Sequence, residues 1–259
     1  MDYAFENSGR QALAPLIAEF YGTLGSGTDG FFDDHIWNAA LHEIRRGGEV
    51  CGFVAEKDGL LAAFYLRQAW LRDARAVLEQ AVARFGLKKA FVTSGDGAMV
   101  SLCLERAVLR GGKIELQAYN FRLGERAVRP AEFDGTHLRL VEPAEYGWVN
   151  ELTDGEWAED IRARDDLQVW ALEDGGRALG FGLVCPHRMR PEIRDIGNYV
   201  LPEHRRKGVG RSVIMNLTQR VLSEGLTPSV GCWYYNRESY LTLASAGYLP
   251  VTRIFCVEM

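Results

Sequence analysis

The residues best suited to chemistry form a short glycine-containing stretch in the last quarter of the chain. An apolar run stops at Pro202, and three basic residues, 205–207, then lead into Gly208-Val209-Gly210. Apolar residues at helical spacing follow the glycines. The stretch therefore lies at a helix N-terminus, where backbone N–H groups lack partners and carry partial positive charge. Because glycine lets a ligand approach the backbone closely, this order predicts a site for a phosphate or pyrophosphate.

Two well-known phosphate loops do not fit this stretch. The dinucleotide-binding fingerprint needs a third glycine where Val213 stands, and a Walker loop needs a Gly-Lys-Ser/Thr run that the sequence lacks. The alternative without a ligand is a tight turn with a solvated basic edge.

The wider string resembles a known family. Residues Val200 to Gly210 are similar to the acyl-CoA pyrophosphate loop of the GNAT superfamily of N-acetyltransferases, whose core is Arg/Gln-x-x-Gly-x-Gly. A second block, Asn236-x-x-Ser239 with a later Gly-Tyr pair, resembles the family's Asn after the fifth strand and the helix that ends in Gly-Phe/Tyr. The resemblance covers residues 137–259 and not the first half of the chain.

The resemblance implies an acyl-CoA-dependent N-acyltransferase with acetyl-CoA as cosubstrate. The acceptor would be a primary amine, either a small molecule or a protein amino group, that attacks the thioester carbon directly. In the family's fold, strand 193–200 splays from strand 230–235, and the pantetheine arm binds there like an added strand. The residues implied to bind coenzyme A are Tyr199, Val200, Arg205, Arg206, Lys207, Gly208, Val209, Gly210, Arg211 and Asn236.

Direct transfer needs a base for the ammonium proton, donors for the oxyanion and an acid for the leaving thiolate. Asp195 is the candidate base, with Glu192 and His187 as further candidates. Asp195 and Glu192 point to opposite faces of a strand, so at most one of them would serve. For the acid, the family often has a Tyr where this chain has Leu243, and Tyr240, about 60° away round the helix, is the candidate instead. The alternatives are plain surface carboxylates and a tyrosine that only packs.

The departure at Leu243 leaves other functions open. Tyr234 and Tyr235 lie near the splayed strand and are further candidates for the acid. A non-catalytic CoA-binding regulatory or scaffold protein is the second hypothesis. A third, a nucleotide-binding module, predicts binding of ATP or NAD that acetyl-CoA does not displace.

The two halves of the chain have similar orders of predicted elements. In the first half a hairpin is followed by a long helix, a strand, a short helix and a strand, and the second half has the same order with one more strand after its hairpin. We therefore expect a degenerate GNAT-like repeat in the first half, without the glycine loop, whereas the alternative is an unrelated α/β domain. The expected fold is α/β (α+β), with a mixed, mostly antiparallel twisted sheet flanked by helices. The expected domains are 1–130 and 131–259, with residues 122–136 as the linker.

Individual elements follow from periodicity and turn residues. In the first half we expect helices at 10–20, 34–46, 73–85 and 98–107, and strands at 50–56, 60–66, 89–93 and 113–120. In the second half we expect strands at 137–141, 168–173, 178–184, 193–200, 230–235 and 250–258. We also expect a helix at 143–154, a short helix that ends near residue 164, and one helix each after Gly208 and Asn236. The acidic segment 142–166 would either attract a cationic amine or form a solvated face.

Composition excludes several classes of protein. A net charge of −5 over 259 residues does not favour nucleic acid. No apolar run reaches the ~18 residues of a membrane span, and no secretory signal precedes the first helix. Five scattered cysteines without C-x-x-C indicate reduced thiols and a cytoplasmic protein. His35 and His42 would stand roughly 10 Å apart on one helix, too far for one ion, so no metal is expected. The oligomeric state stays open, and a homodimer is one option.

Overall fold

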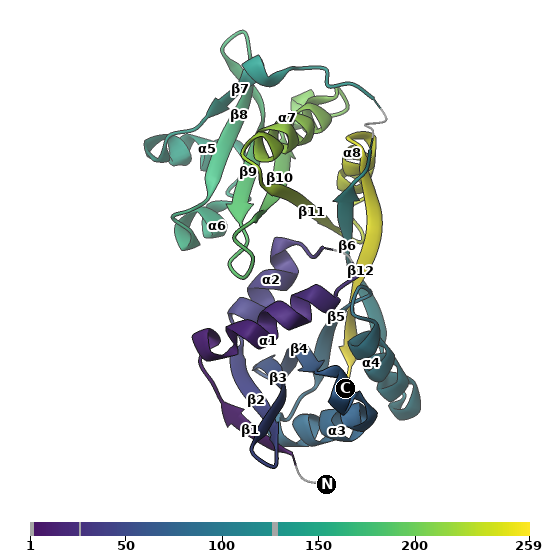
Figure 1. The fold of residues 1–259 in the computed structure, drawn as a ribbon. Helices are drawn as coiled ribbons and strands as arrows, with labels where there is room; N and C mark the ends of the chain where they lie inside the picture. Colours follow the sequence, from purple (N-terminus) through teal and green to yellow (C-terminus); the bar gives the residue numbers. More distant parts are fainter. Residues whose placement is uncertain (1–2, 26, 126–128) are drawn as a thin grey trace. The chain divides into compact units, whose positions relative to one another are not determined.

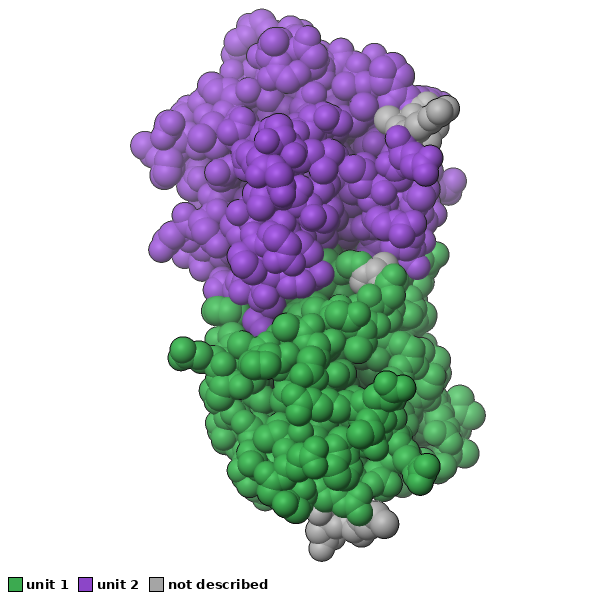
Figure 2. All heavy atoms as spheres, in the orientation of Figure 1, with its two compact units in different colours: residues 1–119, 252–259 green, residues 120–251 purple. Residues whose placement is uncertain are grey.

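The computed structural model describes residues 3–25, 27–125 and 129–259 (Figure 1). They form two compact units, which Figure 2 colours separately. Unit 1 comprises residues 1–119 and 252–259, and unit 2 comprises residues 120–251. This division differs from the expected boundary at 130, because the last eight residues of the chain return to unit 1. No helix in the described ranges is long and apolar enough to cross a membrane.

Unit 1 is a mixed sheet with helices. Its strand order is β1-β2-β3-β4-β5-β12-β6; the pairs from β1 to β4 are antiparallel, as is β5 with β12, whereas β4 and β5 are parallel. The elements of this half are β1 Ala4–Asn7, α1 Arg10–Thr23, α2 Gly30–Trp37, β2 Ala40–Arg46, β3 Glu49–Lys57, β4 Leu60–Leu66, η1 Gln68–Asp73, α3 Ala74–Phe85, β5 Lys89–Thr93, α4 Gly97–Arg110 and β6 Ile114–Leu123.

The predicted helix 34–46 is wrong. Helix α2 ends at Trp37, and the following residues form strand β2, which pairs with β1 and β3. Leu41 and Ile44 are both buried, and at a separation of three they point to opposite faces of a strand. A sheet that is covered on both faces therefore imitates helical spacing here. His35 and His42 lie on different elements, and the described residues contain no cluster of His, Cys, Asp or Glu suited to a metal ion.

Unit 2 has the same kind of sheet. The strand order is β7-β8-β9-β10-β11-β6-β12, antiparallel from β7 to β10 and parallel between β10 and β11. The elements of this half are η2 Gly135–His137, β7 Leu138–Leu140, η3 Pro143–Glu145, α5 Tyr146–Leu152, α6 Ala158–Ala163, β8 Gln168–Asp174, β9 Arg177–Pro186, β10 Ile193–Val200, η4 Pro202–His204, α7 Val209–Ser223, β11 Thr227–Trp233, α8 Arg237–Ser245 and β12 Tyr248–Glu258.

The predicted repeat is confirmed. The series β1-α1-α2-β2-β3-β4-η1-α3-β5-α4-β6 has the same order and the same strand pairings as β7-α5-α6-β8-β9-β10-η4-α7-β11-α8-β12. The long strands β6 and β12 each contribute to both units. A detail of packing is repeated as well. A Cβ atom at Gly52 would lie 1.9 Å from the carbonyl oxygen of Tyr65, and one at Gly180 would lie 2.6 Å from that of Tyr199.

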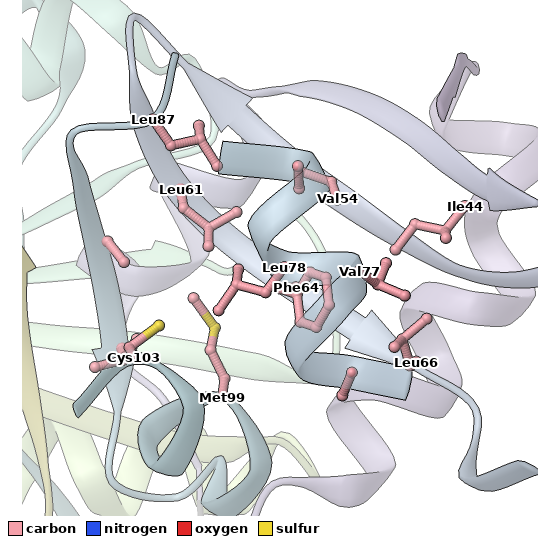
Figure 3. Packing of buried hydrophobic residues seen from close by; sticks show 14 of the residues in the cluster. Ile44, Val54, Leu61, Phe64, Leu66, Val77, Leu78, Leu87, Met99 and Cys103 are labelled. Carbon is pink, nitrogen blue, oxygen red and sulfur yellow. The ribbon is translucent and has the colours of Figure 1, made fainter. Parts of the chain in front are cut away.

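The core of unit 1 lies between its sheet and helices α3 and α4. Figure 3 shows strand residues such as Val54 and Phe64 beside Val77 and Leu78 of α3, with Met99 of α4 nearby. The apolar faces of these amphipathic helices therefore bury the sheet, as their sequence periodicity predicts.

The expected linker, 122–136, falls within unit 2. Its first residues continue β6 as far as Leu123, and residues 126–128 lie outside the described residues. Residues 130–133, which we call the strap, pack on α7. The backbone amides of Glu132 and Phe133 donate to Ser212 Oγ, and Asn216 Nδ2 donates to the Phe133 carbonyl. Polar side chains of α7 thus hold a segment whose own sequence has no periodicity.

Candidate active site

The central strands of unit 2 separate along most of their length. Strands β10 and β11 pair at only three positions, the last being Asp195 with Ser229, although β10 continues to Val200 and β11 to Trp233. We call the space between 196–200 and 230–233 the β10–β11 opening. Most side chains that border it are half-buried or exposed rather than fully buried. The backbone of these strands is therefore available to pair with an extended ligand.

The opening leads to the start of α7. The N-cap residue Gly208 has a left-handed backbone with φ of +81°, Arg206 has φ of +63°, and no side chain caps the helix. Among the described residues, no acceptor meets the backbone amides of 206–211. Several N–H groups that converge at a helix N-terminus fit a pyrophosphate. The predicted glycine loop thus has the geometry that its sequence implied.

The two glycines of the loop have different roles. A Cβ at Gly208 would lie 2.2 Å from Glu132 Cγ, in addition to the strain of its backbone angle. A Cβ at Gly210 would lie 2.9 Å from Asn198 Nδ2 and 3.2 Å from Val200 Cγ2. Gly210 therefore lets α7 approach β10 closely, a packing role that the sequence did not reveal.

The basic side chains of the loop are not equivalent. Arg211 donates to the Pro130 carbonyl at 2.8 Å and to Glu132 Oε1 at 2.6 Å, so its guanidinium holds the strap. Arg205 donates to the Val200 carbonyl at 3.2 Å. The side chains of Arg206 and Lys207 are exposed. Of the predicted cationic contacts, these last two side chains are the best placed to meet phosphate.

Asp195 lies at the closed end of the β10–β11 opening. It is opposite Ser229 on β11 and Cys185 on β9. On a strand of period two, Asp195 shares a face with Tyr199, whose ring makes an edge contact with Trp157. Glu192 precedes β10 and is exposed, so the argument that it points to the opposite strand face does not apply.

His187 is a poor base. It is buried, and desolvation, with the charges of Arg190, Arg164 and Arg194, lowers its pKa from 6.5 to about 3. The imidazole is therefore neutral at physiological pH and binds a proton weakly.

Helix α8 carries the remaining predicted residues. Asn236 is its N-cap and accepts from the Ser239 amide at 3.0 Å. Leu243 is buried. The ring of Tyr240 packs against Phe121 of β6, with ring centroids 5.5 Å apart. The structure thus places Tyr240 in a packing contact with β6.

Ion pairs neutralise part of the acidic segment 142–166. Arg139 hydrogen-bonds to Glu145 and lowers its pKa, and it also pairs with Glu173. Arg164 lowers the pKa of Asp166 in the same way. These acids serve the local structure, which supports the solvated-face alternative for them.

From the sequence, Tyr234 and Tyr235 are only further candidates for the acid, and Trp233 is not considered. Trp233, Tyr234 and Tyr235 follow the apolar part of β11 and immediately precede Asn236. All three are exposed. A run of aromatics at the end of a core strand, directly before an N-cap, is the signal that could have identified them.

Family models match both halves of the chain. An acetyltransferase (GNAT) domain model matches residues 10–123, and an acetyltransferase (GNAT) family model matches residues 136–247. The chain therefore belongs to the GNAT acetyltransferase family, with one GNAT-like domain in each half. No curated protein sequence matches it.

Solved structures show the same tandem fold. A GNAT-family acetyltransferase from Colwellia psychrerythraea has a TM-score of 0.82 and 16% identity, and the match covers 100% of both chains. A tandem GNAT protein from the clavulanic acid biosynthesis pathway has a TM-score of 0.64 and 16% identity, over 99% of this chain and 98% of that one. A GCN5-related N-acetyltransferase from Sphaerobacter thermophilus has a TM-score of 0.62 and 12% identity, over 99% and 95%. At these identities the likeness concerns the fold.

Proposed function

We propose that this protein transfers an acetyl group from acetyl-CoA to a primary amine, and that unit 2 performs the reaction. The observation that carries the proposal is the β10–β11 opening, which begins at a carboxylate, Asp195, and ends at the bare amides of 206–211. An extended ligand with a diphosphate at one end fits that arrangement. Coenzyme A has this form, and its acetyl thioester supplies an activated acyl group when bound.

Each part of the opening has a separate task in this proposal. The backbone of Tyr199 and Val200 would pair with the pantetheine arm, and the amides of 206–211 would hold the pyrophosphate. Asp195 would accept the ammonium proton of the acceptor, directly or through water. Backbone N–H groups of β10 that have lost their β11 partner are available to stabilise an oxyanion.

The proton for the leaving thiolate has no equally clear source. Tyr240 remains the proposed acid. Its ring makes an edge contact with Phe121 of β6. The acceptor is proposed to be a small-molecule amine or a protein amino group. A cytoplasmic location is proposed from the five thiols, four of them buried.

A second function is favoured by one observation. Leu243 is a buried apolar residue where the family often has a tyrosine. A unit that lacks the acid could bind coenzyme A without turnover and act as a regulatory protein or scaffold.

The test combines binding with turnover. Calorimetry measures acetyl-CoA affinity, and thiol release with mass detection of the acetylated product is followed over a panel of amines. Binding together with amine-dependent thiol release supports the enzyme. Binding without release on any amine supports the second function, and the absence of binding contradicts both.

A further inference from the structure

The aromatic run at the end of β11 is exposed to solvent. Trp233, Tyr234 and Tyr235 are 39%, 52% and 68% exposed. No other aromatic residue in the described ranges appears among the exposed large hydrophobic side chains. An exposed apolar group of this size commonly marks a binding site.

Two of the three rings form a platform. The rings of Trp233 and Tyr235 are parallel to within 3°, with centroids 6.3 Å apart. Two parallel rings this close together present aromatic surface on which a flat ring can stack. Tyr234 stands at 85° to Tyr235 and is not part of the parallel pair. We call Trp233 and Tyr235 the aromatic pair.

The position of the aromatic pair indicates its ligand. Strands β10 and β11 run parallel, so the pair lies at the same end of the β10–β11 opening as the amides of 206–211. A coenzyme whose diphosphate binds those amides must place its adenosine beyond the strand ends. The strap and helix α8 both border the start of α7: Glu132 of the strap lies against Gly208, and Thr242, in the second half of α8, lies against Gly210.

Charge distinguishes these two surfaces. On the strap side, the Glu132 carboxylate is paired with Arg211, and residues 130–133 include no cation that could meet a phosphate. On the α8 side, the first helical residue is Arg237, next to the aromatic pair. Adenine stacks favourably on aromatic rings, and a cation stabilises a neighbouring phosphate.

We propose that the aromatic pair stacks the adenine ring of coenzyme A and so positions the nucleotide end of the cosubstrate. The inference rests on the proposed function, because it takes coenzyme A as the ligand of the glycine loop.

The first half of the chain provides an internal comparison. Asp96 caps α4 by accepting from the Met99 amide, as Asn236 caps α8. The residues before Asp96 are Thr93-Ser94-Gly95. Thr93 is buried, and the Gly95 carbonyl accepts from Gly25. The half without a glycine loop therefore has small residues where unit 2 presents aromatic rings.

The test compares two ligands on matched variants. Calorimetry measures the affinity of acetyl-CoA and of S-acetyl-4′-phosphopantetheine, which lacks the 3′-phosphoadenosine and keeps only one of the two phosphates of the diphosphate. The double variant W233L/Y235L should lose roughly 5- to 100-fold in acetyl-CoA affinity and about nothing in affinity for the shorter ligand. Y234L, at a similarly exposed neighbour, is the control and should bind both ligands as the wild type does.

Fluorescence gives a second readout. Adenine stacked on Trp233 should quench its emission, so acetyl-CoA should quench the wild type more than W233F, which keeps a stacking ring and hence most of the affinity. An equal loss for both ligands, or no loss for either, would overturn the inference while leaving coenzyme A binding in place. Failure of the wild type to bind acetyl-CoA would instead contradict the proposed function itself.

Discussion

The two units share one order of strands and helices but differ where the central strand meets its helix. In unit 1, β4 is followed by η1, and the first amide of α3 donates to the Leu71 carbonyl. The preceding residue, Asp73, accepts from Tyr3 Oη and from an Arg46 guanidinium. In unit 2, the N-cap of the matching helix is Gly208, and no acceptor among the described residues receives a hydrogen bond from the backbone N–H groups there. One fold therefore presents a closed helix start in one half and an open one in the other.

The two units also differ in how deeply their central parallel strands, β4–β5 and β10–β11, are buried. In unit 1, β4 and β5 also pair over a short distance, ending at Leu61 opposite Ala90. Beyond this point, however, β4 and β5 remain largely buried, with Phe64 and Leu66 in the core (Figure 3). In unit 2 most of the corresponding residues are half-buried or exposed, although Ile196 and Val230 are buried. Short pairing of the central strands is therefore common to both units, and the burial of the residues beyond it is what distinguishes them.

The largest expected effect is on kcat/KM, from replacing the Asp195 carboxylate at the closed end of the β10–β11 opening. Asp195 and Leu61 occupy the last paired positions of their strands, so Asp195→Leu gives unit 2 the residue of unit 1. We expect Asp195→Asn and Asp195→Leu to lower kcat/KM by about 10²–10⁴, the usual contribution of a general base. Acetyl-CoA affinity should change little. Steady-state kinetics with the best amine checks this, and Glu192→Gln, at an exposed acid nearby, is the control; full activity of Asp195→Asn would contradict it.

The glycine at the helix start is next. Gly208→Val should lower acetyl-CoA affinity about 100-fold. The strained backbone and the clash with Glu132 should reorient the loop amides, and each hydrogen bond lost to a charged phosphate costs ~1.5–3 kcal/mol. Gly86, at the C-terminal end of α3, has a similar φ of +61° with open space around it. Gly86→Val should therefore cost ~1–2 kcal/mol of stability and no affinity. Calorimetry and thermal unfolding of both variants separate the two effects; equal affinity for Gly208→Val and wild type would count against the site.

A third change makes the helix packing of unit 2 resemble that of unit 1. Gly182 of β9 lies under α7, and a Cβ there would lie 2.4 Å from Leu217 and 2.7 Å from Val213. Val54, two residues after Gly52 as Gly182 is after Gly180, packs in the core of unit 1. Gly182→Val should displace α7, with a loss of ~1–3 kcal/mol in stability.

Because α7 carries the amides of the loop, the same variant should bind acetyl-CoA about 10-fold less tightly, about 1.4 kcal/mol. The reverse change, Val54→Gly, should destabilise unit 1 without creating or removing coenzyme binding. Calorimetry on both variants tests the pair, and unchanged binding by a folded Gly182→Val protein would show that helix position is not critical.

The smallest effect concerns the loop before β10, where unit 1 has only the short turn Asp58-Gly59. The pKa of His187 falls from 6.5 to about 3 on folding because of burial and nearby arginines. Between these two values the unfolded chain binds the proton and the folded protein does not. Stability should therefore be constant above pH 6.5 and fall by about 1.4 kcal/mol per pH unit below it.

Urea unfolding at pH 7 and pH 5 measures that slope. His187→Asn should reduce it. A wild-type midpoint that does not move between the two pH values would contradict the assignment.

Much of the fold followed from local signals in the sequence. Turns such as Lys57-Asp58-Gly59 located the hairpins, and strand 193–200 was predicted with its observed bounds. The glycine loop was also predicted, because its chemistry depends on a few adjacent residues. The helix at 34–46 was wrong because burial on both sheet faces imitated a helical period.

Other features depend on contacts distant in sequence. The strap has no periodicity of its own and is held by Ser212 and Asn216 of α7. The last strand joins unit 1 by pairing with β5, and no local sequence pattern predicts this pairing. The packing role of Gly210 likewise depends on Asn198 and Thr242, from two other elements. Such features follow from tertiary structure rather than from propensity.

The central claim is that only the open helix start of unit 2 grips coenzyme A. Native mass spectrometry of the intact chain with excess acetyl-CoA tests it directly by counting ligands. We predict one molecule per chain, lost in Gly208→Val and retained in Asp73→Asn, which changes the matching position of unit 1. Two molecules per chain, or one that survives Gly208→Val in a folded protein, would contradict the account.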